Sequence, residues 1–145
     1  MSTRCQIKFI SEGKEVLIYR HSDGYPEGDF GVVNSISKFL KWDSRGDDIE
    51  YIPANFIFFE KVNMALHFNE NREVRGENPI TLNNLLEEDY MQLGYGVCQP
   101  NDYHGDIEFL YTVDIEKRTL TVQSMPKFKI IEEYAINENG DMIKQ

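Results

Sequence analysis

The sequence predicts an α+β fold, in which an antiparallel β-sheet made of an N-terminal hairpin and C-terminal strands carries two to three helices on one face. Three observations support this prediction. Apolar and polar residues alternate near the N-terminus, apolar residues recur at helical spacing in the middle of the chain, and alternation returns after residue 107. Strands grouped apart from helices are typical of the α+β class. A chain of 145 residues also suits a single domain over residues 1–145.

The N-terminal hairpin is predicted from two short runs. Residues 5–10 alternate between apolar and polar side chains, which is the period of a half-buried strand. Residues 12–14 (EGK) supply a turn, and residues 15–19 return as a second strand.

Two helices are predicted next. Residues 33–40 carry apolar side chains at helical spacing, with Asp29 as the expected cap. A second helix is predicted to begin near Pro53, since proline suits a first helical turn, and to run to Leu66. Apolar residues nearly surround this second helix, so we expect it to be central and buried.

A third, shorter helix is predicted over residues 81–92. Thr81 is its expected cap, and Leu82, Leu85 and Leu86 are expected to face inward. Residues 94–97 (GYGV) are interpreted as a strand or a tight bend.

The C-terminal part of the chain is predicted to complete the sheet. Residues 107–115 and 119–125 form the expected hairpin, and residues 128–136 form a third strand or an extended edge. From about residue 137 onward the chain is polar, and we expect a loose tail.

The formal net charge of −10 is concentrated in one stretch of the chain. Residues 76–116 contain no Lys or Arg and carry nine acidic residues. Such a surface repels a phosphate backbone, so we expect no direct nucleic-acid binding. The stretch is interpreted as a solvated acidic face or, alternatively, as a docking surface for a basic partner.

The sequence also bears on compartment and cofactors. No apolar run reaches the roughly 18 residues that a membrane span needs, and the N-terminus does not resemble a signal peptide. We therefore expect a cytoplasmic protein that does not bind membranes. Cys5 and Cys98 are predicted to be buried thiols, and with three histidines and no C-x-x-C we expect no structural zinc site and no cofactor.

Two loops carry the residues best suited to chemistry. His21-Ser22-Asp23 follows the second predicted strand, and His104-Gly105-Asp106 precedes the 107–115 strand. If those two strands pair within one sheet, the loops lie at the same end. His21 and His104 are then candidate general bases, and Asp23 and Asp106 are candidates to orient them or to bind a divalent metal ion. Hydrolysis by an activated water is the chemistry this arrangement would support.

The same loops also have a purely structural interpretation. Asp23-Gly24 is a strong turn dipeptide, in which Asp bonds backbone amides and Gly tolerates positive φ. Without catalysis, the loops would instead contact a ligand. The candidate ligand-binding residues are Arg20, His21, Tyr25, Tyr95, Tyr103 and His104, whose tyrosines suit the stacking of a ring.

The loop segments resemble a group of small proteins encoded by phages, prophages and other mobile elements. Residues 18–27, IYRHSDGYPE, are similar to an I-Y-x-H-x-D-G-Y-P-E motif that follows an N-terminal strand in that group. Residues 104–109 (HGDIEF) resemble its later H-G-D-I-E-aromatic motif, and residues 54–57 (ANFI) resemble a helix of the same proteins. The resemblance brings no settled activity. It implies an accessory gene, a setting in which proteins that bind and neutralise a host system are common.

Two functions follow as hypotheses. The first is an accessory protein, located in the host cytoplasm, that binds, sequesters or blocks a host defence protein or a small nucleotide-like ligand. The second is a small metal- or His-dependent hydrolase or lyase that acts on a nucleotide-type substrate. We favour the non-enzymatic hypothesis, because no complete catalytic motif is present. Self-association through an exposed strand edge is a third option.

Overall fold

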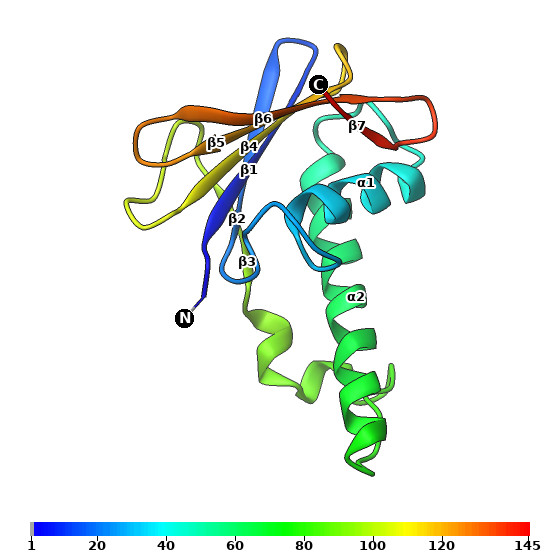
Figure 1. Ribbon diagram of the computed structural model, residues 1–145. Helices are drawn as coiled ribbons and strands as arrows, with labels where there is room; N and C mark the ends of the chain where they lie inside the picture. Colours follow the sequence, from blue (N-terminus) through cyan, green and yellow to red (C-terminus); the bar gives the residue numbers. More distant parts are fainter. Residues whose placement is uncertain (1) are drawn as a thin grey trace.

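The computed structural model describes residues 2–145, which form one seven-stranded sheet and two α-helices (Figure 1). The predicted α+β class is confirmed. The strands are β1 (Cys5–Ser11), β2 (Lys14–Arg20), β3 (Tyr95–Cys98), β4 (Phe109–Asp114), β5 (Thr119–Ser124), β6 (Lys129–Ile136) and β7 (Met142–Lys144). The helices are α1 (Val32–Trp42) and α2 (Ile52–Val74), and the short 3-10 helices are η1 (Leu85–Glu87) and η2 (Asp89–Gln92).

The sheet is mostly antiparallel and larger than the sequence predicts. Its strand order is β3-β2-β1-β4-β5-β6-β7, and both predicted hairpins are present as β1/β2 and β4/β5. The pair β1/β4 is parallel, which differs from the fully antiparallel sheet expected. The reason is the long connection through both helices, since parallel neighbours need such a crossover whereas hairpins do not.

The hydrophobic core lies between one face of the sheet and the two helices, which Figure 1 shows on the same side of the sheet. Phe9 of β1 packs edge-to-face with Phe39 of α1 and Phe56 of α2, with ring centroids 6.0 and 5.5 Å away. Around these rings lie fully buried aliphatic side chains from the sheet and both helices: Ile7, Ile18, Val32, Ile36, Ile52, Val113, Leu120 and Val122. The packing of these side chains fixes the helices relative to β1 and β2.

Only the first half of α2 is buried, so the prediction of a central buried helix is wrong. Its buried residues are Ile52, Phe56 and Glu60, which repeat every four residues along one face. Phe58, on another face, is 59% exposed. The second half of α2 extends beyond the sheet (Figure 1). There it is joined to η2, because Phe68 packs on Tyr90 with ring centroids 4.6 Å apart.

The predicted helix over residues 81–92 is also wrong. This segment contains only the 3-10 helices η1 and η2, and Leu82 and Leu86 are 91% and 93% exposed. Asn84 Oδ1 accepts hydrogen bonds from the Thr81 amide and hydroxyl, which closes a local turn in place of a helix cap. At α1 the capping position belongs to Gly31 and not to Asp29.

The segment expected to be a loose tail instead forms β7, which pairs with β6. Asn137 Oδ1 accepts hydrogen bonds from the backbone of Asn139 and Asp141 and so closes the preceding turn. Ser37 of α1 donates to the Gly140 carbonyl at 2.7 Å, which attaches this turn to the helix layer.

Among residues 2–145, neither α-helix combines the length and apolar character that a membrane span requires.

Candidate functional site

The two histidine loops lie at the same end of the sheet, although β2 and β4 do not pair with each other. Cys5, at the start of β1, pairs with Arg20 at the end of β2 and with Phe109 at the start of β4. The loop that follows β2 and the loop that precedes β4 therefore flank the start of β1. The expected co-location is found, with β1 as the strand between them.

Tyr19 contacts both histidines on the face of the sheet opposite the helices. Its hydroxyl is 2.8 Å from His21 Nδ1, and its ring stacks on that of His104 with centroids 4.5 Å apart. His104 Nε2 is 3.8 Å from Cys98 Sγ. Gln6 holds the His104 loop in place, because its Oε1 accepts from the His104 amide at 3.0 Å. Gln6 is fully buried, a role that the alternating pattern of β1 did not indicate.

The two aspartates do not orient these imidazoles. Asp23 Oδ1 accepts a hydrogen bond from the Tyr25 hydroxyl at 3.2 Å, and Asp106 forms an ion pair with Arg4. Within residues 2–145, no group of three or more His, Cys, Asp or Glu side chains is arranged to hold a metal ion. Tyr19 therefore brings the two imidazoles of the hydrolase hypothesis together, but neither has the carboxylate contact that the hypothesis expects.

The Asp23-Gly24 turn has a clear structural role. Asp23, not Gly24, adopts the positive φ, at 54°. Gly24 is needed for close approach, since a Cβ there would lie 2.8 Å from the Thr3 carbonyl oxygen. Its own carbonyl accepts a 2.7 Å hydrogen bond from the buried Tyr111 hydroxyl. These contacts hold the loop against β1 and β4 whatever the loop binds.

The sheet divides the predicted ligand-binding residues between its two faces. Arg20 and Tyr95 line a cavity on the helix side. His21 and His104 lie on the opposite face with Tyr19, where Tyr103 packs edge-to-face on Phe128 at 5.4 Å. One ligand cannot contact all of these residues, so they define two separate places.

The helix-side cavity, which we call the Glu60 cavity, has a volume of about 740 Å³. This volume lies within the range of about 300–1,000 Å³ that is usual for small-molecule sites. The cavity is bordered by the end of β2, the loop after it, α1, α2 and the start of β3. Its lining residues are Arg20, Ser22, Asp23, Asp29, Phe30, Ser35, Lys38, Glu60, Asn63, Met64, Leu66, His67, Phe68, Glu70, Gly94 and Tyr95.

A buried ion pair forms part of the wall of the Glu60 cavity. Arg20 and Glu60 are each 5% exposed, and Arg20 Nη1 lies 3.6 Å from Glu60 Oε1. Arg20 also donates to the Ser22 carbonyl at 3.0 Å, to Ser35 Oγ at 3.1 Å and to the Phe30 carbonyl at 2.6 Å. Each of its three nitrogens is therefore already bonded to the protein.

Two buried polar atoms at the cavity lack hydrogen-bond partners. Glu60 Oε1 and His67 Nδ1 are both inaccessible to solvent, and neither is hydrogen-bonded by any residue in the described part of the chain. Burial raises the pKa of Glu60, although the nearby Arg20 charge and the Ser35 hydroxyl act to lower it. Burial likewise raises the pKa of the Tyr95 hydroxyl. Buried polar atoms without partners are rare, and a bound ligand is one explanation of them.

Glu60, His67 and Phe30 are not among the candidate residues predicted from the sequence. One signal was available for Glu60, because it continues the apolar face of Ile52 and Phe56 and is the only charged residue there. The sequence does not show the surroundings of His67, because Phe30, whose ring centroid is 4.6 Å away, comes from a distant loop.

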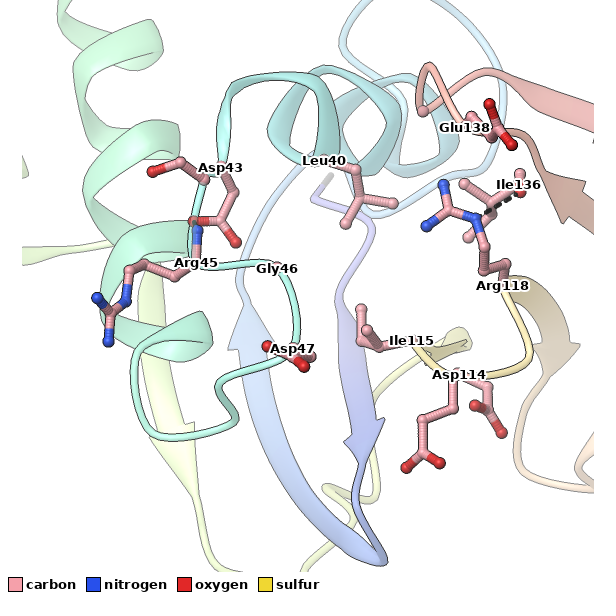
Figure 2. Close-up of a pocket in the computed structure, with 13 residues that line it drawn as sticks. Leu40, Asp43, Arg45, Gly46, Asp47, Asp114, Ile115, Arg118, Ile136 and Glu138 are labelled. Carbon is pink, nitrogen blue, oxygen red and sulfur yellow. Dashed lines mark hydrogen bonds between the residues drawn. The ribbon is translucent and has the colours of Figure 1, made fainter.

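A second hollow, of about 510 Å³, lies at the other end of the sheet (Figure 2). It is bordered by the loop after α1, with Asp43, Arg45 and Asp47, and by residues that follow β4 and β6. Arg118 there donates to the Ile136 carbonyl at 3.1 Å. This hollow contains no residue that the sequence analysis selected and no buried ion pair, so the Glu60 cavity is the stronger candidate.

The chain matches no protein-family model, and neither the curated proteins nor the solved structures include a significant match. The interpretation of the site therefore depends on its geometry.

Proposed function

We propose that the chain acts by binding a small molecule in the Glu60 cavity. The observation that carries this proposal is Glu60, a carboxylate that is 5% exposed, lines the cavity, and has an oxygen, Oε1, without a hydrogen-bond partner in residues 2–145. The ion pair with Arg20, at 3.6 Å, leaves this oxygen without a hydrogen bond, and a buried polar atom without one costs free energy that a ligand N–H or O–H would recover.

Stability alone is a weak explanation of the Arg20–Glu60 pair. A buried ion pair commonly stabilises a fold no more than apolar residues of the same size would. Here the pair also lies at a cavity whose wall includes aromatic side chains of Phe30, Phe68 and Tyr95. Concave sites with a few placed polar groups are typical of ligand binding.

The proposal also includes the biological context in which the protein acts. We infer from the motif resemblance that the protein is a phage or mobile-element accessory factor that acts in the host cytoplasm on a defence system. Docking of a host protein on the acidic 76–116 stretch is less favoured than ligand binding. Three of its nine carboxylates, those of Glu77, Glu88 and Asp106, already pair with arginines.

Catalysis by the histidine loops is the alternative function. The proximity of Tyr19, His21, His104 and Cys98 favours it, because these groups are able to exchange protons. Neither imidazole has a carboxylate partner among the contacts above, so we rank it below ligand binding.

Native mass spectrometry tests the ligand proposal. The wild-type protein and the Glu60→Gln variant are incubated with the small-molecule fraction of a bacterial extract, and bound mass is recorded. Glu73→Gln, on an exposed part of the same helix, is the matched control. We expect a discrete bound mass on wild type and on Glu73→Gln, and its loss on Glu60→Gln.

The result also separates the two functions. His21→Ala and His104→Ala should keep the bound mass, because both side chains lie on the opposite face of the sheet from the cavity. Equal binding by Glu60→Gln and wild type, or no binding by any of them, contradicts the proposal. Loss of binding in the histidine variants alone would favour the opposite face.

A further inference from the structure

The charge around the Glu60 cavity is predominantly negative. Four carboxylates line it, those of Asp23, Asp29, Glu60 and Glu70, against the two cations Arg20 and Lys38. Arg20 is held by protein acceptors through all three of its nitrogens. A phosphate group would therefore meet an excess of negative charge without a free guanidinium to bind it.

The unpartnered atoms of the cavity call for hydrogen-bond donors. Glu60 Oε1 is a carboxylate oxygen, and His67 Nδ1 is an acceptor when the other ring nitrogen carries the hydrogen. Both residues belong to α2 and are seven positions apart. In an α-helix this spacing returns to nearly the same face about 10 Å further along the axis. The two acceptors thus occupy separate ends of one helix face.

The surface between those ends suits methylene groups and positive charge. Met64 lies between Glu60 and His67 in the chain and also lines the cavity. Phe30, whose side chain is 50% exposed, packs against the His67 ring at 4.6 Å. Glu70 Oε2 lies 3.8 Å from His67 Nδ1 and adds negative charge at this end. Aromatic faces attract ammonium groups, and Met side chains pack well against alkyl chains.

We propose that the ligand of the Glu60 cavity is a linear organic cation of the di- or polyamine class. This inference rests on the proposed function and specifies its ligand. One ammonium group binds the Glu60 carboxylate, the methylene chain follows Met64, and a second amine lies near His67 and Glu70. The nucleotide-like ligand considered from the sequence is disfavoured by the same charges.

Isothermal titration calorimetry at low and at physiological salt tests this assignment. The probes are spermidine, putrescine, n-butylamine and AMP, added to wild type, Glu60→Gln and Glu73→Gln. We expect saturable spermidine binding to wild type and to Glu73→Gln, with binding by n-butylamine at least about tenfold weaker and no binding by AMP. Glu60→Gln should weaken spermidine binding by at least about tenfold, since it removes a charge-assisted hydrogen bond.

A second variant keeps the test valid if Glu60→Gln folds poorly. Phe30→Ala removes a half-exposed ring and should weaken spermidine binding severalfold while leaving the circular dichroism spectrum unchanged. Equal affinity of spermidine for wild type, Glu60→Gln and Phe30→Ala overturns the site, because it indicates attraction by surface charge alone. Binding of AMP in place of spermidine overturns the ligand class and leaves the proposed function standing. Absence of any bound mass in the native experiment overturns both.

Discussion

The buried pair of Arg20 and Glu60 makes a strong prediction about stability. In Arg20→Met the apolar stem stays and the charge is lost, so Glu60 keeps a buried carboxylate without its counter-charge. At 3.6 Å and an effective dielectric constant of about 20, the lost attraction is about 4–5 kcal/mol. Broken buried pairs typically lower the free energy of unfolding by about 3–5 kcal/mol. For a chain of this length we expect a melting temperature about 10–15 °C lower.

Urea denaturation, followed by circular dichroism and by fluorescence of the single tryptophan, measures this loss. Arg75→Met is the matched control, because Arg75 pairs with Glu77 at the surface and its loss should cost less than about 1 kcal/mol. The double variant Arg20→Met/Glu60→Leu removes both charges and should recover at least half of the lost stability. The reasoning is refuted if Arg20→Met is no less stable than Arg75→Met, or if the double variant gains nothing over Arg20→Met.

The same variant should respond to pH in one direction. Burial raises the pKa of Glu60 above its ordinary 4.5, and removing Arg20 takes away the charge that opposes this rise. The folded state then binds a proton at Glu60 more readily than the unfolded chain does. The stability deficit is therefore full at neutral pH and shrinks as the pH falls through the raised pKa toward 4.5.

Two further predictions concern the strands around β1. Ellman's reagent should modify only Cys98 in the native protein. Cys5 is fully buried, and burial raises the pKa of its thiol to about 12. Rapid reaction of both thiols in the native protein would contradict this prediction. Gly24→Ala should lower the free energy of unfolding by about 1–3 kcal/mol in urea, because its Cβ would lie 2.8 Å from the Thr3 carbonyl oxygen. Gly105→Ala, whose Cβ would meet no atom within 4 Å, should change it much less, and equal losses would argue against the close contact.

The two hairpins were predictable from the sequence because their strands have local patterns, whereas β7 and the contacts between distant segments were not predicted. The alternation over residues 5–10 and the run of residues 15–19 after the turn identified β1 and β2, and the placement of both histidine loops at strand ends identified their common location. The parallel pairing of β1 with β4 depends on the crossover through the helices, and the residues of the two strands do not indicate it. It is this crossover that places β1 between the two loops.

The errors in the helical region have one physical cause. Amphipathic spacing over residues 81–92 predicts a helix only if a partner covers the apolar face, and Leu82 and Leu86 find none in the described chain. The Glu60 cavity was missed for a similar reason. It exists because α1, α2 and the start of β3 meet at the end of β2, and no single segment carries that information.

The parallel neighbour of β1 has a consequence for how the protein is made. On the ribosome, β1 and β2 emerge together and can pair at once, but the other edge of β1 must wait for residues 109–114. Until then an apolar strand presents an unpaired edge, which is the kind of surface that associates with other chains. The helices are synthesised during this wait and can cover the inner face of the hairpin, but not its edge. The chain is therefore most prone to association while it is being synthesised. We expect slow or chaperone-assisted folding even though the final fold is stable.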